Sequence, residues 1–88
     1  MIYNRGGESM KEIDEKLQKK IKEKTIKFTN ALRDSRTEKH LTQEQFAAKA
    51  SINEKHFGKI ERGESSPSYA TIIKICEGNN IDISKLLN

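Results

Sequence analysis

Apolar residues recur at every third or fourth position through the first long segment of the chain. This spacing predicts one face of a helix, because successive turns bring such positions into line. Ser9 and Glu12 have the spacing of a capping box, so the helix is predicted to begin at Met10 and to end near Lys39. Residues 1–8 show no such period and are predicted to be disordered. The row on the helix comprises Met10, Ile13, Leu17, Ile21, Thr25, Phe28 and Leu32.

Two short helices are predicted next, joined by about three residues. Thr42 and Gln45 form a second capping-box pattern, so one helix should begin directly after Thr42. Asn53 is a favourable N-cap for the other helix, which should cover residues 54–62 and end at Gly63. The inward positions of the two helices are Phe46, Ala47, Ala50, Phe57 and Ile60.

Two further helices complete the pattern. The segment 66–68 has the composition of a helix start, and either Gly78 or Asn79 is expected to end the helix that follows. A last short helix is predicted to begin near Asp82. The apolar positions of the two helices are Tyr69, Ile72, Ile73, Ile75 and Cys76, then Ile81, Ile83, Leu86 and Leu87.

Length and composition agree with a small helical protein. The 88 residues suit a single domain, and neither glycine nor proline occurs between Glu8 and Phe57, which favours helices over short strands. We therefore expect an all-α fold, with a five-helix domain over residues 25–88 and an N-terminal extension over residues 1–24. The chain has no apolar run of membrane-spanning length and no apolar core of a signal peptide.

The basic charge is unevenly placed. The formal net charge is +4 and the isoelectric point is about 9.3, which permits nucleic-acid binding without proving it. Residues 10–39 carry ten basic side chains against six acidic ones, whereas residues 40–66 carry four of each. The surplus thus lies on the long first helix and not on the two short helices. Charge alone does not identify a binding surface.

Two short helices with a brief connection are typical of a helix-turn-helix unit. Several strings of residues add a more specific signal: Leu32-Arg33, Arg36, Leu41-Thr42-Gln43-Glu44-Gln45-Phe46-Ala47, Ile60-Glu61-Arg62-Gly63-Glu64 and Pro67-Ser68. Together they resemble the Cro and phage-repressor family, also called XRE-like, over residues 25–87. The resemblance implies a five-helix, lambda-repressor-like domain that binds double-stranded DNA, usually as a homodimer.

The resemblance also assigns roles to individual side chains. It implies an internal ion pair between Arg36 and Glu61, for which two solvated surface charges are the alternative. It gives Gln43 a phosphate contact at a helix start, where free N–H groups attract anions, although an ordinary polar position is the alternative. It makes the helix over residues 54–62 the recognition helix in the major groove. The DNA-facing positions implied there are Asn53, Glu54, Lys55, His56 and Lys59.

These five positions differ in what they can contribute. Lys55 and Lys59 lie four residues apart on one face, and each can donate to guanine O6 and N7. Glu54 either accepts from a cytosine amine or simply favours the helix N-terminus. Asn53 and His56 are expected to contact the DNA backbone or cap the helix. Without the resemblance, the same set would be interpreted as a solvated face.

Three residues depart from the family pattern. Ser51 stands where a glycine is usual, and a positive φ there costs a serine on the order of 1 kcal/mol. Gly58 lies inside the recognition helix, where it either permits close approach of a phosphate or only loosens the helix, at about 1 kcal/mol relative to alanine. Asn79 stands where a core leucine is usual. The sequence therefore does not determine how the C-terminal helices pack.

Enzymatic and metal-binding functions find little support. His40, His56 and Cys76 are isolated from one another in sequence, and no metal-ligand or nucleophile motif surrounds them. Cys76 falls on an apolar helix face and is interpreted as a core residue. A single cysteine cannot form an internal disulfide, which fits a reducing cytoplasm. We therefore expect no catalytic residues, no metal and no cofactor.

The sequence thus predicts a cytoplasmic, bacterial or phage-encoded transcriptional regulator, with repression as the expected direction. A dimer would bind two half-sites about 34 Å apart. One alternative is an antitoxin, which would have a small protein as partner. Another is a protein-interaction module that uses the first helix. A membrane-surface role is disfavoured, because the polar face of that helix mixes glutamates with lysines and has no tryptophan.

The first part of the long helix poses its own question. Met10, Ile13, Leu17 and Ile21 lie one to three turns beyond the expected domain, and an apolar row left in water is unfavourable. Folding back, binding another protein and pairing with a second copy are the possible solutions, and we expect self-association. The segment 5–9 can be encoded by a purine-rich stretch resembling a ribosome-binding site. Met10 is therefore a candidate natural start, with a flexible tail as the alternative.

Overall fold

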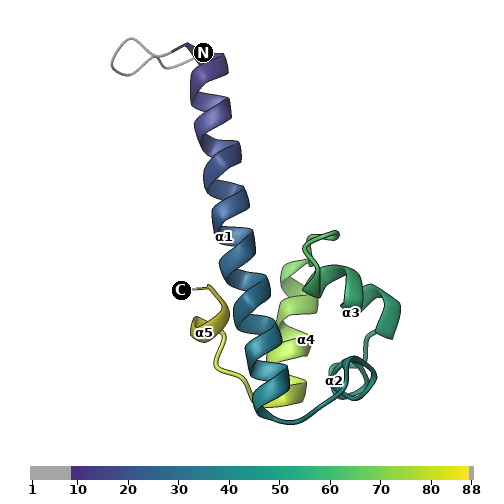
Figure 1. Ribbon diagram of the computed structural model, residues 1–88. Helices are drawn as coiled ribbons and strands as arrows, with labels where there is room; N and C mark the ends of the chain where they lie inside the picture. Colours follow the sequence, from purple (N-terminus) through teal and green to yellow (C-terminus); the bar gives the residue numbers. More distant parts are fainter. Residues whose placement is uncertain (1–8, 88) are drawn as a thin grey trace.

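The computed structural model describes residues 9–87, which form five helices and no strand (Figure 1). The expected all-α class and helix order agree with this arrangement. The disorder predicted for residues 1–8 lies outside the described residues. The helices are α1 (Met10–Glu38), α2 (Gln43–Lys49), α3 (Glu54–Glu61), α4 (Tyr69–Asn79) and α5 (Ser84–Leu87).

The helix starts are fixed by local side-chain caps. The Ser9 hydroxyl accepts from the backbone N–H of Glu12 at 3.1 Å, which places the start of α1 at Met10. Thr42 and Gln45 form a complete capping box at α2, since each side chain accepts from the other residue's backbone N–H. At α3 and α4 a single side-chain cap starts the helix, because the capping side chain accepts from the backbone N–H three residues later. The capping residues there are Asn53 and Ser68.

Two boundaries differ from the sequence prediction. Gly78 and Asn79 do not end α4, because both remain helical and Asn80 forms the C-cap in left-handed backbone at φ 55°. The last helix begins at Ser84 and not at Asp82, whose carboxylate accepts from the backbone N–H of Ser84 at 3.0 Å. Asp82 therefore precedes α5 as a local turn-forming acceptor. Both differences are shifts of one or two residues and leave the packing order unchanged.

A compact core lies between the C-terminal part of α1 and the four shorter helices. At its centre, the rings of Phe46 on α2 and Phe57 on α3 meet at 5.2 Å between centroids, tilted by 46°. Cys76 is buried in this core, as the sequence indicated. The buried hydrophobic residues are Leu32, Phe46, Ala47, Ala50, Phe57, Ile60, Ile75, Cys76, Ile81 and Leu86.

The C-terminal end of α4 packs closely against the end of α2. Gly78 is required there, because a Cβ would overlap the carbonyl oxygen of Lys49 and come within 2.9 Å of the Ala50 Cα. The next residue, Asn79, is buried and donates to the carbonyls of Ile75 at 3.1 Å and Phe46 at 3.2 Å. Asn79 therefore replaces apolar packing by a hydrogen bond that ties α4 to α2.

The N-terminal half of α1 leaves the core and projects away from the other helices (Figure 1). The molecule measures 50 Å along its longest axis and 20 Å and 18 Å across. Helix α1 is continuous through residues 24 and 25, so the division proposed at that point coincides with no break in the backbone. Within the described residues, no helix has both the length and the apolar character needed to cross a bilayer.

Candidate nucleic-acid interface

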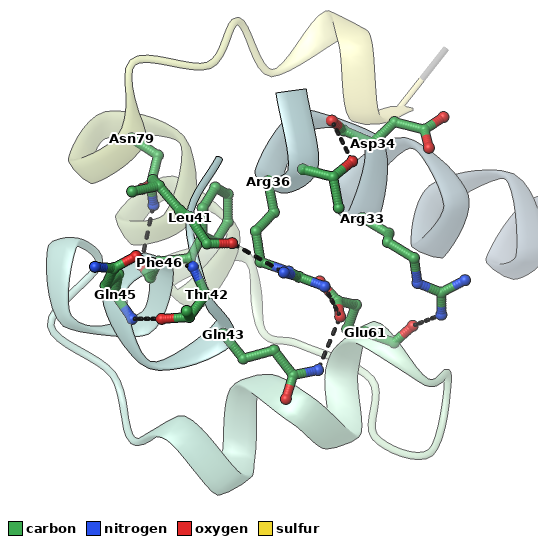
Figure 2. Close-up of polar contacts among 11 residues, drawn as sticks. Arg33, Asp34, Arg36, Leu41, Thr42, Gln43, Gln45, Phe46, Glu61 and Asn79 are labelled. Atoms are coloured by element: carbon green, nitrogen blue, oxygen red, sulfur yellow. Dashed lines mark hydrogen bonds and ion pairs between the residues drawn. The ribbon is translucent and has the colours of Figure 1, made fainter. Parts of the chain in front are cut away.

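Arg36 on α1 and Glu61 at the end of α3 form a bidentate ion pair (Figure 2). The Arg36 Nε lies 2.8 Å from Glu61 Oε2, and the Arg36 Nη2 lies 3.1 Å from Glu61 Oε1. The third guanidinium nitrogen donates to the Leu41 carbonyl at 2.9 Å. The Glu61 side chain is only 2% exposed and that of Arg36 is 17% exposed, so the carboxylate is buried and its partner is half-buried. The structure thus brings together the two residues for which an internal pair was expected.

Gln43 completes a three-helix junction around the same carboxylate. Its side-chain amide, from the first residue of α2, donates to Glu61 Oε1 at 2.8 Å (Figure 2). Glu61 therefore accepts hydrogen bonds from α1 and from α2 while it belongs to α3. A buried carboxylate with all its strong donors in place holds the three helices in one relative orientation. The Gln43 side chain is half-buried, and one of its two amide hydrogens is already engaged.

The junction sets the charge state of Glu61. Burial by itself would raise the pKa of this carboxyl, because a charge is costly away from water. The hydrogen bonds from Arg36 and Gln43, together with the charges of Arg36 and Arg33, outweigh burial and hold the pKa below the ordinary value of a glutamate. Glu61 is therefore ionised at neutral pH and serves as a structural anion.

The outer face of α3 is polar and lies above a shallow hollow of about 350 Å³. Phe57, Gly58, Ile60 and Glu61 are buried, whereas the other side chains of the helix face solvent. The structure thus brings four of the expected site residues to one surface. The hollow is lined by Gln43, Glu54, Lys55, Gly58, Lys59 and Arg62.

Arg62 is the member of this surface that sequence reasoning missed. It is the C-cap of α3, and its guanidinium forms an exposed ion pair with Glu64, at 2.7 Å from Nε to Oε2. A Cβ on Gly58 would come within 3.1 Å of the Arg62 Nη1, so the glycine makes room for this guanidinium along the helix. Neither function considered for Gly58 included this one. The helical spacing from Lys55 and Lys59 to Arg62, seven and three residues, could have identified Arg62.

Asn53 and His56 occupy the start of α3 and do not line the hollow. The Asn53 carboxamide oxygen accepts from the His56 backbone N–H at 3.1 Å, so Asn53 caps the helix. Just before it, Ser51 adopts a positive φ of 57°, the conformation for which a glycine is usual. The turn between α2 and α3 therefore keeps the backbone shape of a helix-turn-helix despite the serine.

A comparison with protein families complements this geometry. The sequence profile of a helix-turn-helix family matches residues 32–86, a segment that contains the junction, the turn and α3. The chain belongs to this family. A search of curated proteins finds no match.

A solved structure gives the same assignment. The helix-turn-helix protein is similar to the restriction-modification controller protein C.AhdI from Aeromonas hydrophila, known from a crystal structure. The two are 32% identical, with a TM-score of 0.67, and the match covers 70% of this chain and 94% of the controller. The expected resemblance to the XRE-like group is thereby confirmed, and the protein is a DNA-binding transcriptional regulator.

Proposed function

We propose that this helix-turn-helix protein reads operator DNA with the outer face of α3, as a homodimer that represses transcription from two half-sites. The observation that carries the proposal is the cationic surface formed by Lys55, Lys59 and Arg62 around the hollow beside Gln43. Two of these cations belong to the exposed face of α3, and the third caps its end. The three cations are exposed on or beside one helix, as contact with the base edges and phosphates of a major groove requires.

The individual roles follow from position. Lys55 and Lys59 are assigned to base edges, with guanine O6 and N7 as acceptors. Glu54, in the first turn, is assigned either to a cytosine amine or to the helix dipole. Arg62 is assigned to a phosphate, which would replace its exposed pairing with Glu64 by a stronger charge-assisted contact.

Phosphates of the flanking backbone are assigned to the helix starts. Gln43 offers its own backbone N–H, in the first turn of α2, and its second amide hydrogen. His56 faces solvent one turn above Asn53 and is assigned a backbone contact, while Asn53 itself acts through its cap. The buried Glu61 touches no DNA in this scheme and keeps α2 and α3 at a fixed angle.

The similarity to C.AhdI favours one specific regulatory context. That protein is a restriction-modification controller and shares 32% identity with this chain over 94% of its own length. We infer that this chain also controls the genes of a restriction-modification system, in the cytoplasm of a bacterium. It acts by occupancy of DNA, without catalysis, metal or cofactor. An antitoxin paired with a small toxin is the less favoured alternative, because no comparison points to it.

The test starts with selection of bound sequences from a random DNA pool. On the selected site, Lys55→Ala should weaken binding by about 1–3 kcal/mol and relax base preference at one position in each half-site. Lys74→Ala, a change of an exposed lysine on α4 away from the hollow, is the matched control and should leave binding unchanged. Equal losses for Lys55→Ala on selected and random DNA would reassign Lys55 to a phosphate.

Salt dependence tests the proposed function as a whole. Binding to random DNA should fall steeply with salt, because each neutralised phosphate releases a counterion. Salt-independent binding, or failure to select any sequence, would favour a protein-interaction module instead. Fusion of the candidate operator to a reporter gene then distinguishes repression from activation.

A further inference from the structure

The N-terminal half of α1 carries an apolar row that nothing else in the described chain covers. Met10, Leu17 and Ile21 are 53%, 52% and 56% exposed, although they share one helix face. In Figure 1 this half of α1 projects beyond all the other helices. A row of large apolar side chains at helical spacing is the usual signature of a helix that packs against another helix.

The exposed row leads directly into a groove in the domain. Where α1 joins the core, a hollow of about 320 Å³ lies between its Ile21–Phe28 face and the loop that precedes α4. The lining on the domain side includes Pro67, Ile72 and Leu87. Leu87 is itself 57% exposed, so the groove is an apolar surface and not a closed cavity. Row and groove form one continuous surface, which we call the α1 surface.

The charges along α1 change sign over the length of this surface. Residues 10–18 carry two lysines and three carboxylates, whereas residues 19–27 carry five lysines and one glutamate. Two such helices side by side in parallel would place five lysines against five lysines. In antiparallel orientation, the acidic segment of each helix lies against the basic segment of the other. Attraction between segments therefore favours the antiparallel pair.

We propose that the α1 surface is covered by a second copy of this chain, with the two α1 helices antiparallel. In this pairing Leu17 of one copy lies opposite Ile21 of the other. The start of each helix, with Met10, then reaches Phe28 and the groove of the other copy. The inference deepens the proposed homodimer by naming the surface that holds it. Its test uses protein without DNA, so that its failure leaves DNA recognition standing.

Self-association of the full chain is measured by sedimentation equilibrium. Ile21→Glu should raise the dimer dissociation constant by at least about tenfold, because the carboxylate would be buried in the pair. Ile26→Glu is the matched control, since Ile26 is 51% exposed but lies about 140° further round the helix from Ile21. It should dimerise like the parent protein. Thermal unfolding of both variants verifies that the domain stays folded.

Orientation is tested by disulfide formation between two variants. When Leu17→Cys and Ile21→Cys proteins are mixed and oxidised, an antiparallel pair should give mainly the mixed 17–21 disulfide. The parent protein, whose Cys76 is buried, should give none. A parent chain that is monomeric at all concentrations overturns the proposal. Equal weakening by Ile21→Glu and Ile26→Glu, or disulfides only between like variants, also overturns it.

Discussion

The two halves of α1 have the same period but different surroundings. Leu32 in the C-terminal half is fully buried, whereas Leu17, about four turns earlier in the same row, is 52% exposed. The periodic pattern therefore identifies which face of a helix is apolar and does not identify what covers it. In the C-terminal half the cover comes from the domain, through α3, α5 and the Arg36–Glu61 pair. In the N-terminal half no other described helix supplies such a cover, and this is the surface that we have proposed for a second copy.

The largest expected effect is the loss of the buried carboxylate that joins the domain to α1. Glu61→Ala leaves the Arg36 guanidinium, 17% exposed, without its partner, which should cost about 3–5 kcal/mol of unfolding free energy. Glu64→Ala is the matched control, because its pair with Arg62 is exposed and should contribute little. Chemical denaturation measures both. Equal small losses would show that the junction does not hold the domain to α1.

A pair of leucines on α1 tests the comparison directly. Leu32→Ala removes a fully buried side chain and should cost about 2–5 kcal/mol. Leu17→Ala should change the stability of the monomer by less than about 0.5 kcal/mol. Both are measured by denaturation at concentrations where the protein is monomeric. A large loss from Leu17→Ala under these conditions would mean that the N-terminal half folds back on its own domain.

Two helical glycines distinguish tight from adjustable packing within the domain. Gly78→Ala should destabilise by about 1–3 kcal/mol or more, because its Cβ meets the backbone of Lys49 and Ala50. Gly58→Ala meets only the far ends of two side chains, those of Arg62 and Gln43, and the gain in helix propensity should leave it neutral or slightly stabilised. Thermal unfolding compares the two. Similar losses at both positions would contradict the close approach of α4 to α2.

The smallest expected effect is a loss of stability at acidic pH. The lowered pKa of Glu61 means that its contribution to stability is complete above the ordinary pKa of a glutamate and is lost as the pH falls through the lowered value. Stability should therefore begin to fall below about pH 5. Glu61→Gln removes the titrating group, so its free energy of unfolding should approach that of the parent in acid. A constant difference between the two at every pH would contradict this assignment.

The sequence was sufficient for features that depend on neighbouring residues. The starts of α1, α2 and α3 were predicted correctly, because each rests on a cap within three residues of the helix start. The end of α4 was not, because Gly78 looks like a terminator in sequence but is a glycine for the sake of packing against α2. The contact between α4 and α2 is visible only in the folded structure.

The candidate site also combines features that the sequence predicts with features that only the folded structure reveals. Lys55 and Lys59 follow from helical spacing once a recognition helix is assumed, and the structure places both at the hollow. The amide of Gln43 turns inward to Glu61, which spacing could not reveal, because the carboxylate lies eighteen residues away in sequence. Arg62 was missed although helical spacing from Lys55 and Lys59 could have identified it; only the space that Gly58 leaves beside its guanidinium had to come from the structure.

Because Cys76 is buried, the reaction of its thiol reports the opening of the domain. Burial first, and the charges of Glu77 and Asp82 to a smaller extent, raise the pKa of the thiol, so the reactive thiolate is scarce while the core is closed. Alkylation in the folded state must then wait for the core to open, and its rate reports how often α4 separates from its neighbours. DNA that stabilises the folded domain should slow this reaction in proportion to occupancy.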